Sequence, residues 1–491
     1  MQFDRFEGNL TTLNTDLVAL GVCEGSDWSE NAHLSALNDA LDGLIKTVAD
    51  EEGFEGKDGQ SIQLHTHGRV APSRINVYGL GNAKCFDPRV FAARTIRAAR
   101  TKGLADIALV NPSEAADAGT LLVEGALQGH YTYDRLKTRD VKPSKIANIQ
   151  LIGTNPSDEE IQTTVRKADG VNLVRDLVND PPIIATPSYL AEHGRRIAKE
   201  NGLDCKIMGK SDLESMGMRL ILAVSAGSSE EPFLIHLTYT PKNATKDTPS
   251  VGIIGKGLTF DAGGLCLKPP GSMADMKLDM AGGAAVLGMM QSIDAVQPDV
   301  IVHALIPTSE NLLGESAYKP GDVIKSYNGK TVEIINTDAE GRLIMADALH
   351  YATELGCDEI INLATLTGAI CVALGNESAG IFSNNDAMRQ EVIDSATEAG
   401  ESVWGMPLDQ RLKKQLKSNV ADFTNCGERW GGAITAALFL SEFVGDTDWT
   451  HIDLAGPSYA AKDRDLTRKG GTGFGVTTLL SYLKRAGQRL G

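Results

Sequence analysis

Residues 336–343 read Asn-Thr-Asp-Ala-Glu-Gly-Arg-Leu and bring two carboxylates and a guanidinium within five positions. The octet follows the apolar stretch 331–335, and this order predicts a turn from a strand into a helix. In an extended turn, residues two apart point to the same side, so Asp338 and Glu340 can converge. Converging carboxylates repel one another unless a proton or a cation lies between them. The octet therefore indicates a cation site or, as the plain alternative, solvated acids at a loop tip.

Two more polar segments follow a predicted strand at 251–254. Residues 255–264 read Gly-Lys-Gly-Leu-Thr-Phe-Asp-Ala-Gly-Gly, and residues 268–279 begin with a lysine, end in an aspartate and lead into a helix. Ligands of an open α/β sheet bind outside the carboxyl ends of its strands. We therefore expect Asp261 and Asp279 to lie at neighbouring strand ends.

The ligand types in these segments favour hard or borderline divalent cations. Carboxylates without histidine or cysteine suit Mg, Mn or Zn ions. Four carboxylates, on Asp261, Asp279, Asp338 and Glu340, would neutralise two such ions. Lys268 and the guanidinium of the octet would then make the site net positive, which favours an anionic intermediate or a bound oxyanion.

The glycine-rich segment does not match the known phosphate-binding patterns. A P-loop requires G-x-x-x-x-G-K-[ST], but Ser250 stands where the first glycine should be, and Gly257 follows Lys256. The G-x-G-x-x-G pattern fails because Phe260 takes its last position. No H-E-x-x-H occurs, which excludes the usual one-zinc metalloprotease. Two-metal phosphoester hydrolysis, which also uses carboxylate clusters, stays open from the residues alone.

The elements that must position these residues alternate between strands and helices. In the first part of the chain, strands are predicted at 16–20, 74–78, 105–110 and 149–152, with helices at 87–102, 113–128 and 157–179. In the second part, strands are predicted at 220–224, 233–238, 251–254, 301–305 and 359–363. This alternation predicts two α/β domains, the larger with a mixed, mostly parallel sheet flanked by helices. We place a smaller N-terminal domain at 1–156, a connecting helix and linker at 157–182, and a larger C-terminal domain that carries the polar segments at 183–491.

Composition narrows the class of protein. The 491 residues carry 64 acidic and 47 basic side chains, a net charge of −17 that argues against polyanions as main partners. The seven cysteines are scattered, odd in number and without C-x-x-C, so reduced thiols are expected rather than disulfides or a thiolate zinc site. No apolar run is long enough for a membrane span, and the N-terminus lacks a signal-peptide pattern. A soluble, cytoplasmic protein is expected.

At this point the chain resembles a known family. The octet is similar to the identifying motif of the leucyl aminopeptidases, cytosolic two-metal exopeptidases of the M17 type. Residues 255–264 and 268–279 resemble that family's other site segments, as do Trp430-Gly-Gly, residues 449–456 and Gly470-Gly-Thr-Gly473. The first 150 residues resemble the family only in arrangement, with a macro-like domain.

The resemblance implies a role for each site residue. Asp338, Glu340 and Asp261 would hold one metal ion, Mn or Zn or else Mg. Asp261 and Glu340 would bridge to a second ion, completed by Asp279 and by Lys256 as a neutral amine. The metal-bridging water or hydroxide would attack the peptide carbonyl, and the second ion with Asp279 would also bind the free α-amine of the substrate.

The resemblance further implies the residues that act beside the metals. Lys268 would stabilise the oxyanion, and Arg342 would hold a bicarbonate that accepts a proton from the attacking water. The side-chain pocket, suited to leucine or another apolar residue, would involve Met276, Thr365, Gly368 and Ala455. The family is typically a homohexamer, and the apolar stretch 431–440 is a weak hint of such assembly. The histidines at 65, 67, 303 and 451 are expected to be structural.

Some bacterial members of this family also bind DNA as architectural or regulatory proteins, which gives a second hypothesis. Its footprint would be two basic runs in the N-terminal part: Arg94, Arg97, Arg100 and Lys102, and Arg135, Lys137, Arg139, Lys142 and Lys145. A solvated helix face and a basic loop are the plain alternative.

Overall fold

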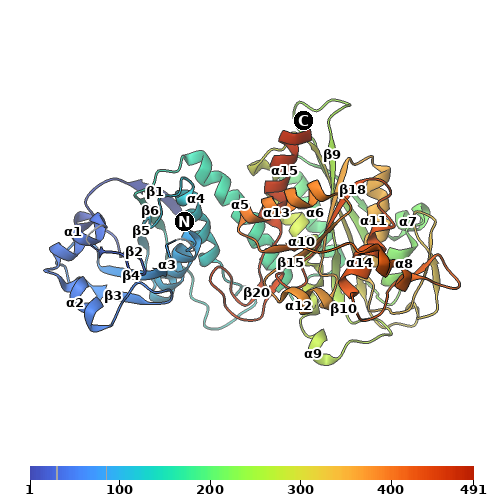
Figure 1. Cartoon of the computed structure of the whole chain (residues 1–491), viewed down its shortest axis with the longest axis horizontal. Coiled ribbons are helices and arrows are strands. Elements are labelled where there is room, and N and C mark those ends of the chain that lie inside the picture. The colour runs from blue at the N-terminus through green and yellow to red at the C-terminus, as the bar shows by residue number, and fades with distance from the viewer. Residues whose placement is uncertain (29–30, 84–85, 491) are drawn as a thin grey trace. The chain divides into compact units, whose positions relative to one another are not determined.

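The structure is a computed structural model that describes residues 1–28, 31–83 and 86–490. The chain forms two compact units (Figure 1). The first contains Met1–Ala168 and Asp463–Arg468, and the second contains Asp169–Lys462 and the chain from Lys469 onward. The division falls inside helix α5 (Asp158–Asn179), and the domain limits given above stay a prediction.

The first unit is built on one sheet with helices on both faces. Its strand order is β1 (Gln2–Phe6), β6 (Asn148–Ile152), β5 (Asp106–Val110), β2 (Leu17–Cys23), β4 (Arg74–Gly81) and β3 (Ser61–His65). All neighbours run parallel except β3, which is antiparallel to β4. Helices α1 (Ala32–Ala40) and α2 (Leu44–Glu51) cover one face, and α3 (Pro88–Lys102) and α4 (Ala118–His130) cover the other.

Helix α3 shows how local sequence sets an element. Asp87 caps its N-terminus by accepting a hydrogen bond from the Arg89 N–H, and Pro88 occupies the first turn, where no amide donor is needed. Gly103 ends the helix with φ of 67°, a left-handed conformation that glycine adopts without a Cβ penalty. These are the standard signals of a helix start and stop, and the sequence prediction for this helix is confirmed.

The second unit contains a larger mixed sheet. Its strand order is β16 (Val403–Gly405), β15 (Ala379–Ser383), β18 (Asp448–Asp453), β14 (Glu359–Ala364), β9 (Ser250–Gly255), β11 (Ile301–Asn311), β8 (Phe233–Tyr239) and β7 (Asp204–Met208), with β10 (Gly257–Asp261) paired to β11. The central strands β18, β14, β9 and β11 run parallel. β8 pairs antiparallel with both β11 and β7, and β15 pairs antiparallel with β18. The predicted fold class, two α/β domains with a mixed, mostly parallel sheet in the larger one, is confirmed.

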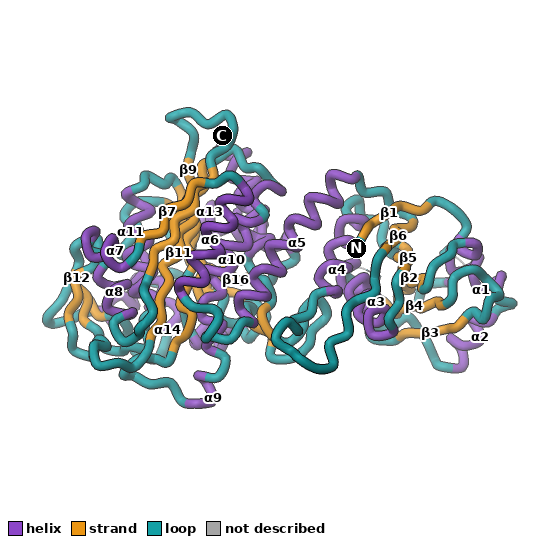
Figure 2. Tube along the Cα trace, turned by 180° about the vertical axis from the view of Figure 1, so that it is seen from behind, coloured by secondary structure: helices purple, strands orange, loops and turns teal. Residues whose placement is uncertain are grey.

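Helices bury both faces of this sheet, as Figure 2 shows. One face packs against the second half of α5 and against α6 (Pro187–Asn201), α10 (Ala281–Gln291), α13 (Asp386–Ala399) and α15 (Val476–Leu490). The other packs against α7 (Lys210–Met216), α8 (Arg219–Ser225), α11 (Gly341–Glu354), α12 (Gly368–Leu374) and α14 (Gly432–Ser441). Adjacent residues Ile253 and Ile254 belong to opposite cores, as expected for a strand buried on both faces.

The strand predicted at 220–224 is wrong, because these residues form α8. A short apolar run fits a buried strand or a buried helix equally well, and periodicity cannot separate them. The helix is favoured by a distant acid: the Asp347 carboxylate accepts hydrogen bonds from the Leu220 and Ile221 N–H groups at the start of α8. That long-range cap has no signal in the local sequence.

Small elements complete the second unit. A three-stranded sheet pairs β12 (Val323–Lys325) with β13 (Thr331–Glu333) and β13 with β17 (Phe423–Thr424). A two-stranded ladder joins β19 (Tyr459–Ala460) and β20 (Gly470–Gly471), and α9 (Pro270–Met273) is a single turn. No helix in the described ranges is long and apolar enough to span a membrane. The six cysteines in those ranges are free thiols, and Cys85 lies outside them.

Candidate metal-binding active site

The acidic residues gather where several elements of the second unit end. β9 ends at Gly255, Lys256 follows it directly, and Asp261 ends β10. Asp279 does not lie at a strand end as expected, because it belongs to a 3-10 helix, η3 (Met276–Met280), that leads into α10. The 3-10 turn brings its carboxylate to the same place by a different route.

The octet forms the predicted turn between a strand and a helix. It follows β13 and ends in the first turn of α11, with Glu340 at the N-cap position. A Cβ at Gly341 would lie 2.6 Å from the Lys256 Nζ atom, so any other residue would push this side chain aside. The glycine therefore lets this lysine pass close to the helix start.

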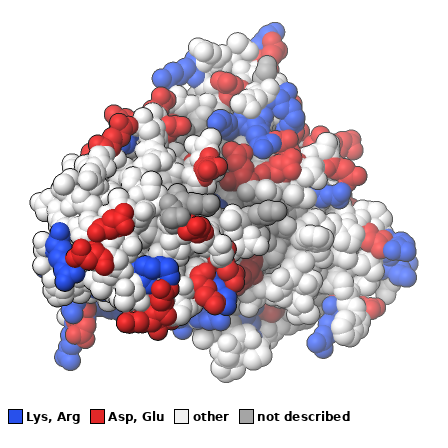
Figure 3. All heavy atoms as spheres, turned by 60° about the vertical axis from the view of Figure 1, so that its left-hand side comes forward, with Lys and Arg blue, Asp and Glu red and all other residues white. Residues whose placement is uncertain are grey.

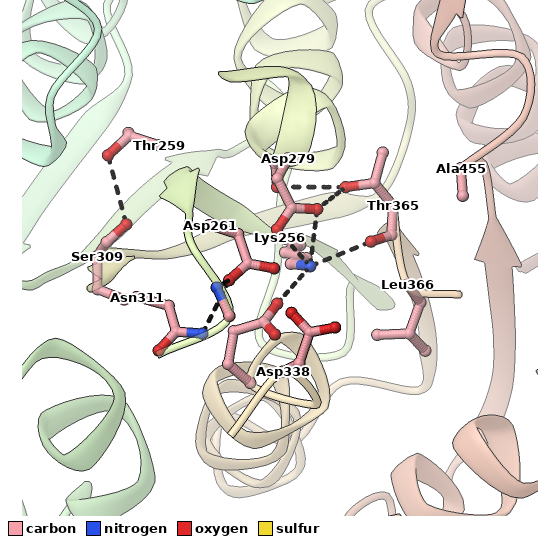
Figure 4. A network of polar contacts seen from close by, with 12 residues as sticks. Lys256, Thr259, Asp261, Asp279, Ser309, Asn311, Asp338, Thr365, Leu366 and Ala455 are labelled. Atoms are coloured by element: carbon pink, nitrogen blue, oxygen red, sulfur yellow. Dashed lines mark hydrogen bonds and ion pairs between the residues drawn. The ribbon is translucent and has the colours of Figure 1, made fainter. Parts of the chain in front are cut away.

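Three carboxylates converge at this point. Asp261, Asp338 and Glu340 each offer an oxygen, and these atoms lie within 4.8 Å of one another. Asp261 and Glu340 are both 2% exposed, and Asp338 is half-buried. In the described residues, this is the one group of three or more histidine, cysteine or acidic side chains with ligand spacing, and no histidine joins it. Figure 4 shows Asp261, Asp279 and Asp338 directed toward one another around Lys256.

Two ammonium groups lie among the carboxylates. The Lys256 Nζ is 2.8 Å from an oxygen of Asp279 and 2.8 Å from one of Glu340. The Lys268 Nζ is 2.7 Å from Asp261 Oδ2 and 2.6 Å from Asp338 Oδ1. For both lysines, burial lowers the pKa, but attraction to the surrounding carboxylates outweighs it and raises the pKa above the usual value.

The lysines leave part of the acidic charge uncompensated. Four carboxylates against two ammonium groups give a local charge of −2. The pKa of Asp261 is raised, mainly by burial and also by repulsion from the neighbouring acids. The pKa of Asp279 is raised to about 6, and burial is again the main cause. Glu340 Oε2 is buried without a hydrogen-bond donor among the described residues. An orphaned carboxylate oxygen in an under-neutralised pocket fits a site for divalent cations.

Arg342 lies beside this cluster in the first turn of α11. The side chain is buried, and its Nη1 donates a hydrogen bond of 3.0 Å to the Asn425 carbonyl oxygen. Its Nε is also buried, with no acceptor among the described residues. Burial lowers the pKa of this guanidinium, because desolvation disfavours the charged form. Arg342 therefore keeps one buried donor that no described residue satisfies.

The four predicted pocket residues lie at four different elements. Met276 begins η3, Gly368 begins α12, and Ala455 follows β18. Thr365 follows β14, and its hydroxyl donates a hydrogen bond of 2.7 Å to Asp279 Oδ1. The structure thus connects Thr365 to the acidic cluster directly (Figure 4). No such bond joins Met276, Gly368 or Ala455 to the cluster in the described chain.

Several supporting residues were not predicted. Asn311, at the end of β11, donates hydrogen bonds of 2.8 Å to Asp261 Oδ1 and 3.0 Å to the Thr337 carbonyl oxygen. Asp453, at the end of β18, accepts hydrogen bonds from the Leu366 N–H and from the Thr367 hydroxyl. Both are polar residues at strand ends, and that signal in the sequence could have identified them.

The arginines of the first predicted basic run form ion pairs and hydrogen bonds within the first unit. Arg94 lies 2.6 Å from Asp58 and 2.7 Å from Asp465, and Arg97 donates to the Arg464 carbonyl oxygen. Arg100 donates to the His130 carbonyl oxygen. On the face seen in Figure 3, blue side chains are interspersed with red ones rather than gathered into one basic stripe. These contacts give the DNA hypothesis no support.

Comparison with known proteins agrees with this class of site, a carboxylate-rich metal centre in an α/β domain. The catalytic domain of the cytosol aminopeptidase family matches residues 172–480, and the N-terminal domain of the same family matches residues 19–140. A probable cytosol aminopeptidase of Aquifex aeolicus is 39% identical, over 99% of this chain and 98% of the relative. One of Solibacter usitatus is 42% identical, over 86% of this chain and 89% of the relative.

Solved structures agree over nearly the whole chain. A mutant of tomato leucine aminopeptidase is 34% identical with a TM-score of 0.90, covering 99% of this chain and 96% of that one. The bottromycin maturation enzyme BotP in complex with Mn is 32% identical with a TM-score of 0.85, covering 96% and 100%. The chain belongs to the cytosol aminopeptidase family and is a peptide-bond hydrolase. The family resemblance recognised from its motifs is confirmed.

Proposed function

We propose that this enzyme is a leucyl aminopeptidase that removes an N-terminal leucine or other apolar residue from peptides with the help of two divalent ions. The observation that carries the proposal is the buried cluster of four carboxylates with only two ammonium groups to balance them. Such a cluster is unfavourable on its own and becomes favourable once cations bind.

The residues available fit two neighbouring ions. Asp338, Glu340 and Asp261 would hold the first, and Asp261, Glu340, Asp279 and Lys256 would hold the second. Lys256 would bind as a neutral amine, because two adjacent dications would lower the pKa that the carboxylates raise in their absence. Mn or Zn suits this oxygen-rich set with one nitrogen, and Mg suits the oxygens alone. BotP is described in complex with Mn, which supports Mn among these. When bound, the ions supply an acidified water as nucleophile and polarise the scissile carbonyl.

The chain's own cations would then act on the substrate. Lys268 is kept protonated by Asp261 and Asp338, so its ammonium is suited to stabilise a developing oxyanion. Arg342, with an unused buried donor, would hold a bicarbonate ion that accepts a proton from the attacking water. This division of roles needs no histidine.

The free amine and the side chain of the substrate would be recognised on either side of Asp279. This carboxylate would attract the α-ammonium group, which restricts cleavage to the first residue. Thr365 holds Asp279 in place and would also line the side-chain pocket with Met276, Gly368 and Ala455. Small or flexible residues of this kind leave room for an apolar side chain.

A cytoplasmic homohexamer is part of the proposal, and the names of the curated relatives are compatible with a cytosolic location. The apolar stretch 431–440 no longer supports the assembly, because residues 436–440 of α14 are fully buried within one chain. Several large apolar side chains of the second unit are exposed instead, including Trp430 at 74% and Val372 at 90%. These could be covered by neighbouring subunits.

The decisive experiment compares leucyl and N-acetyl-leucyl chromogenic amides in the Mn-loaded enzyme, with an aryl phosphate as a third substrate. We expect release from the leucyl amide alone, since acetylation removes the amine that Asp279 would bind. Similar rates for the two amides would refute the amine site. Phosphate release without amide cleavage would favour the two-metal phosphoesterase.

A further inference from the structure

Asn425 lies against the octet although 82 positions separate it from the nearer end of the motif at Leu343. It follows β17, and its backbone N–H donates a hydrogen bond of 2.9 Å to the Glu333 carbonyl oxygen at the end of β13. The parallel pairing of β13 and β17 therefore brings Asn425 beside the residues that leave β13. The residue is completely buried.

The side-chain amide of Asn425 is fully used by this one loop. Its Oδ1 accepts hydrogen bonds from the N–H groups of Ile335 at 2.8 Å and Asn336 at 3.3 Å. Its Nδ2 donates to the carbonyl oxygens of Asn336 at 2.7 Å and Ala339 at 3.4 Å. An asparagine amide has two donor hydrogens and one acceptor oxygen with two lone pairs, so all four positions are filled.

The backbone of Asn425 reaches the other half of the octet. Its carbonyl oxygen accepts the 3.0 Å hydrogen bond from Arg342 Nη1. One residue thus contacts the loop on both sides of Asp338 and also the guanidinium two positions beyond Glu340. The hydrogen bonds of Asn425 in the described chain reach the loop backbone and the guanidinium rather than the two carboxylates.

We propose that Asn425 is a positioning residue that fixes the 335–339 loop, and with it the Asp338 and Glu340 carboxylates, in the geometry that binds metal. The inference rests on the proposed metal site. The loop must hold two repelling carboxylates close together, and four hydrogen bonds to a buried amide oppose their separation. Groups that orient metal ligands in this indirect way are worth about 10- to 100-fold in metal affinity.

Asn425→Asp is the sharpest variant because it is nearly isosteric and replaces the Nδ2 donor by an oxygen. That oxygen would face the carbonyl oxygens of Asn336 and Ala339, which are both acceptors. We expect the Mn²⁺ dissociation constant of the metal-free protein, measured by calorimetry, to rise about 10- to 100-fold. Activity should return as Mn²⁺ is raised.

A matched control is Asn362→Asp in the same unit. Asn362 is also completely buried, but its amide bonds the Trp449 indole and the His451 ring rather than the octet. We expect this variant to lower the unfolding temperature while keeping the wild-type affinity for Mn²⁺. If Asn425→Asp does not fold, Asn425→Ala, which removes the amide without adding an acceptor, should show the same loss of affinity.

The outcomes separate the inference from the proposed function. Wild-type affinity in both folded Asn425 variants would overturn the positioning role and leave the metal site intact. An equal loss in the Asn362→Asp control would also overturn it, since the effect would then follow from stability. A wild-type protein that binds no Mn²⁺ would overturn the metal site itself and the inference with it.

Discussion

Replacing Lys268 by methionine should separate catalysis from metal binding. The ammonium is the counter-ion of Asp261 at 2.7 Å and Asp338 at 2.6 Å, and its removal changes the local charge from −2 to −3. A more negative cluster attracts cations at least as strongly, so the affinity for Mn²⁺ should stay equal or rise. The transition state, in contrast, loses one charged oxyanion donor, which typically costs about 10² to 10³ in kcat, or about 2.7 to 4 kcal/mol.

The assay is steady-state hydrolysis of a leucyl amide at saturating Mn²⁺, together with calorimetric titration of the metal-free variant. Lys277→Met is the matched control, because the Lys277 ammonium donates to the Asn179 carbonyl oxygen and not to the cluster. We expect the control to keep the wild-type kcat. A Lys268→Met enzyme that loses metal affinity and kcat together would refute the oxyanion role, and a change confined to KM would show that Lys268 only positions substrate.

Three further predictions address the metal, the pH and the assembly. Chelation should abolish amide hydrolysis with the far-UV circular dichroism unchanged, and Mn²⁺ or Zn²⁺ should restore it; full activity in a protein shown to be metal-free would contradict the mechanism. Burial, followed by repulsion from His303, lowers the pKa of His236 to about 4, so unfolding free energy should fall as the pH drops from about 6.5 to about 4. The loss of unfolding free energy should approach about 3 kcal/mol. If a His236→Gln variant loses as much unfolding free energy between about pH 6.5 and about pH 4, groups other than His236 are responsible. Light scattering should give a mass near six times 52.3 kDa, and a fully active monomer would contradict the hexamer.

The sequence predicted most elements of the fold because strand and helix periodicities are local. Strands such as β9 and β14 carry mostly apolar residues, and α3 carries both of its capping signals. The run at 220–224 failed because its helical state depends on Asp347, which lies more than a hundred positions away. Local sequence cannot report a cap supplied by a distant element.

In the site, too, residues within contiguous motifs could be predicted from the sequence, whereas residues brought in by distant elements were harder to predict. The octet and the segments 255–264 and 268–279 carry the carboxylates and lysines in motifs that are contiguous in sequence, so those residues could be named. Asn311 has the weaker signal of a polar residue at a strand end. Asn425 could not be named, because it reaches the site only through the pairing of β17 with β13. The assignment of individual roles to the named residues stays a prediction.

The carboxylates differ in how firmly the protein holds them, and this difference fits a preformed cation site. Asp261 Oδ1 accepts two hydrogen bonds of 2.8 Å, from the Gly263 N–H and from Asn311 Nδ2, which leaves Oδ2 directed to the cluster. Asp279 is held in a similar way by the Thr365 hydroxyl. Glu340 is held on one oxygen by Lys256, while its Oε2 has no donor among the described residues. Ligands fixed by neutral donors keep their place when cations enter, whereas those paired with ammonium groups can exchange one cation for another. In the proposed metal site, the scaffold would therefore hold the like charges together before a cation binds, and the charge of the ions would stay available for catalysis.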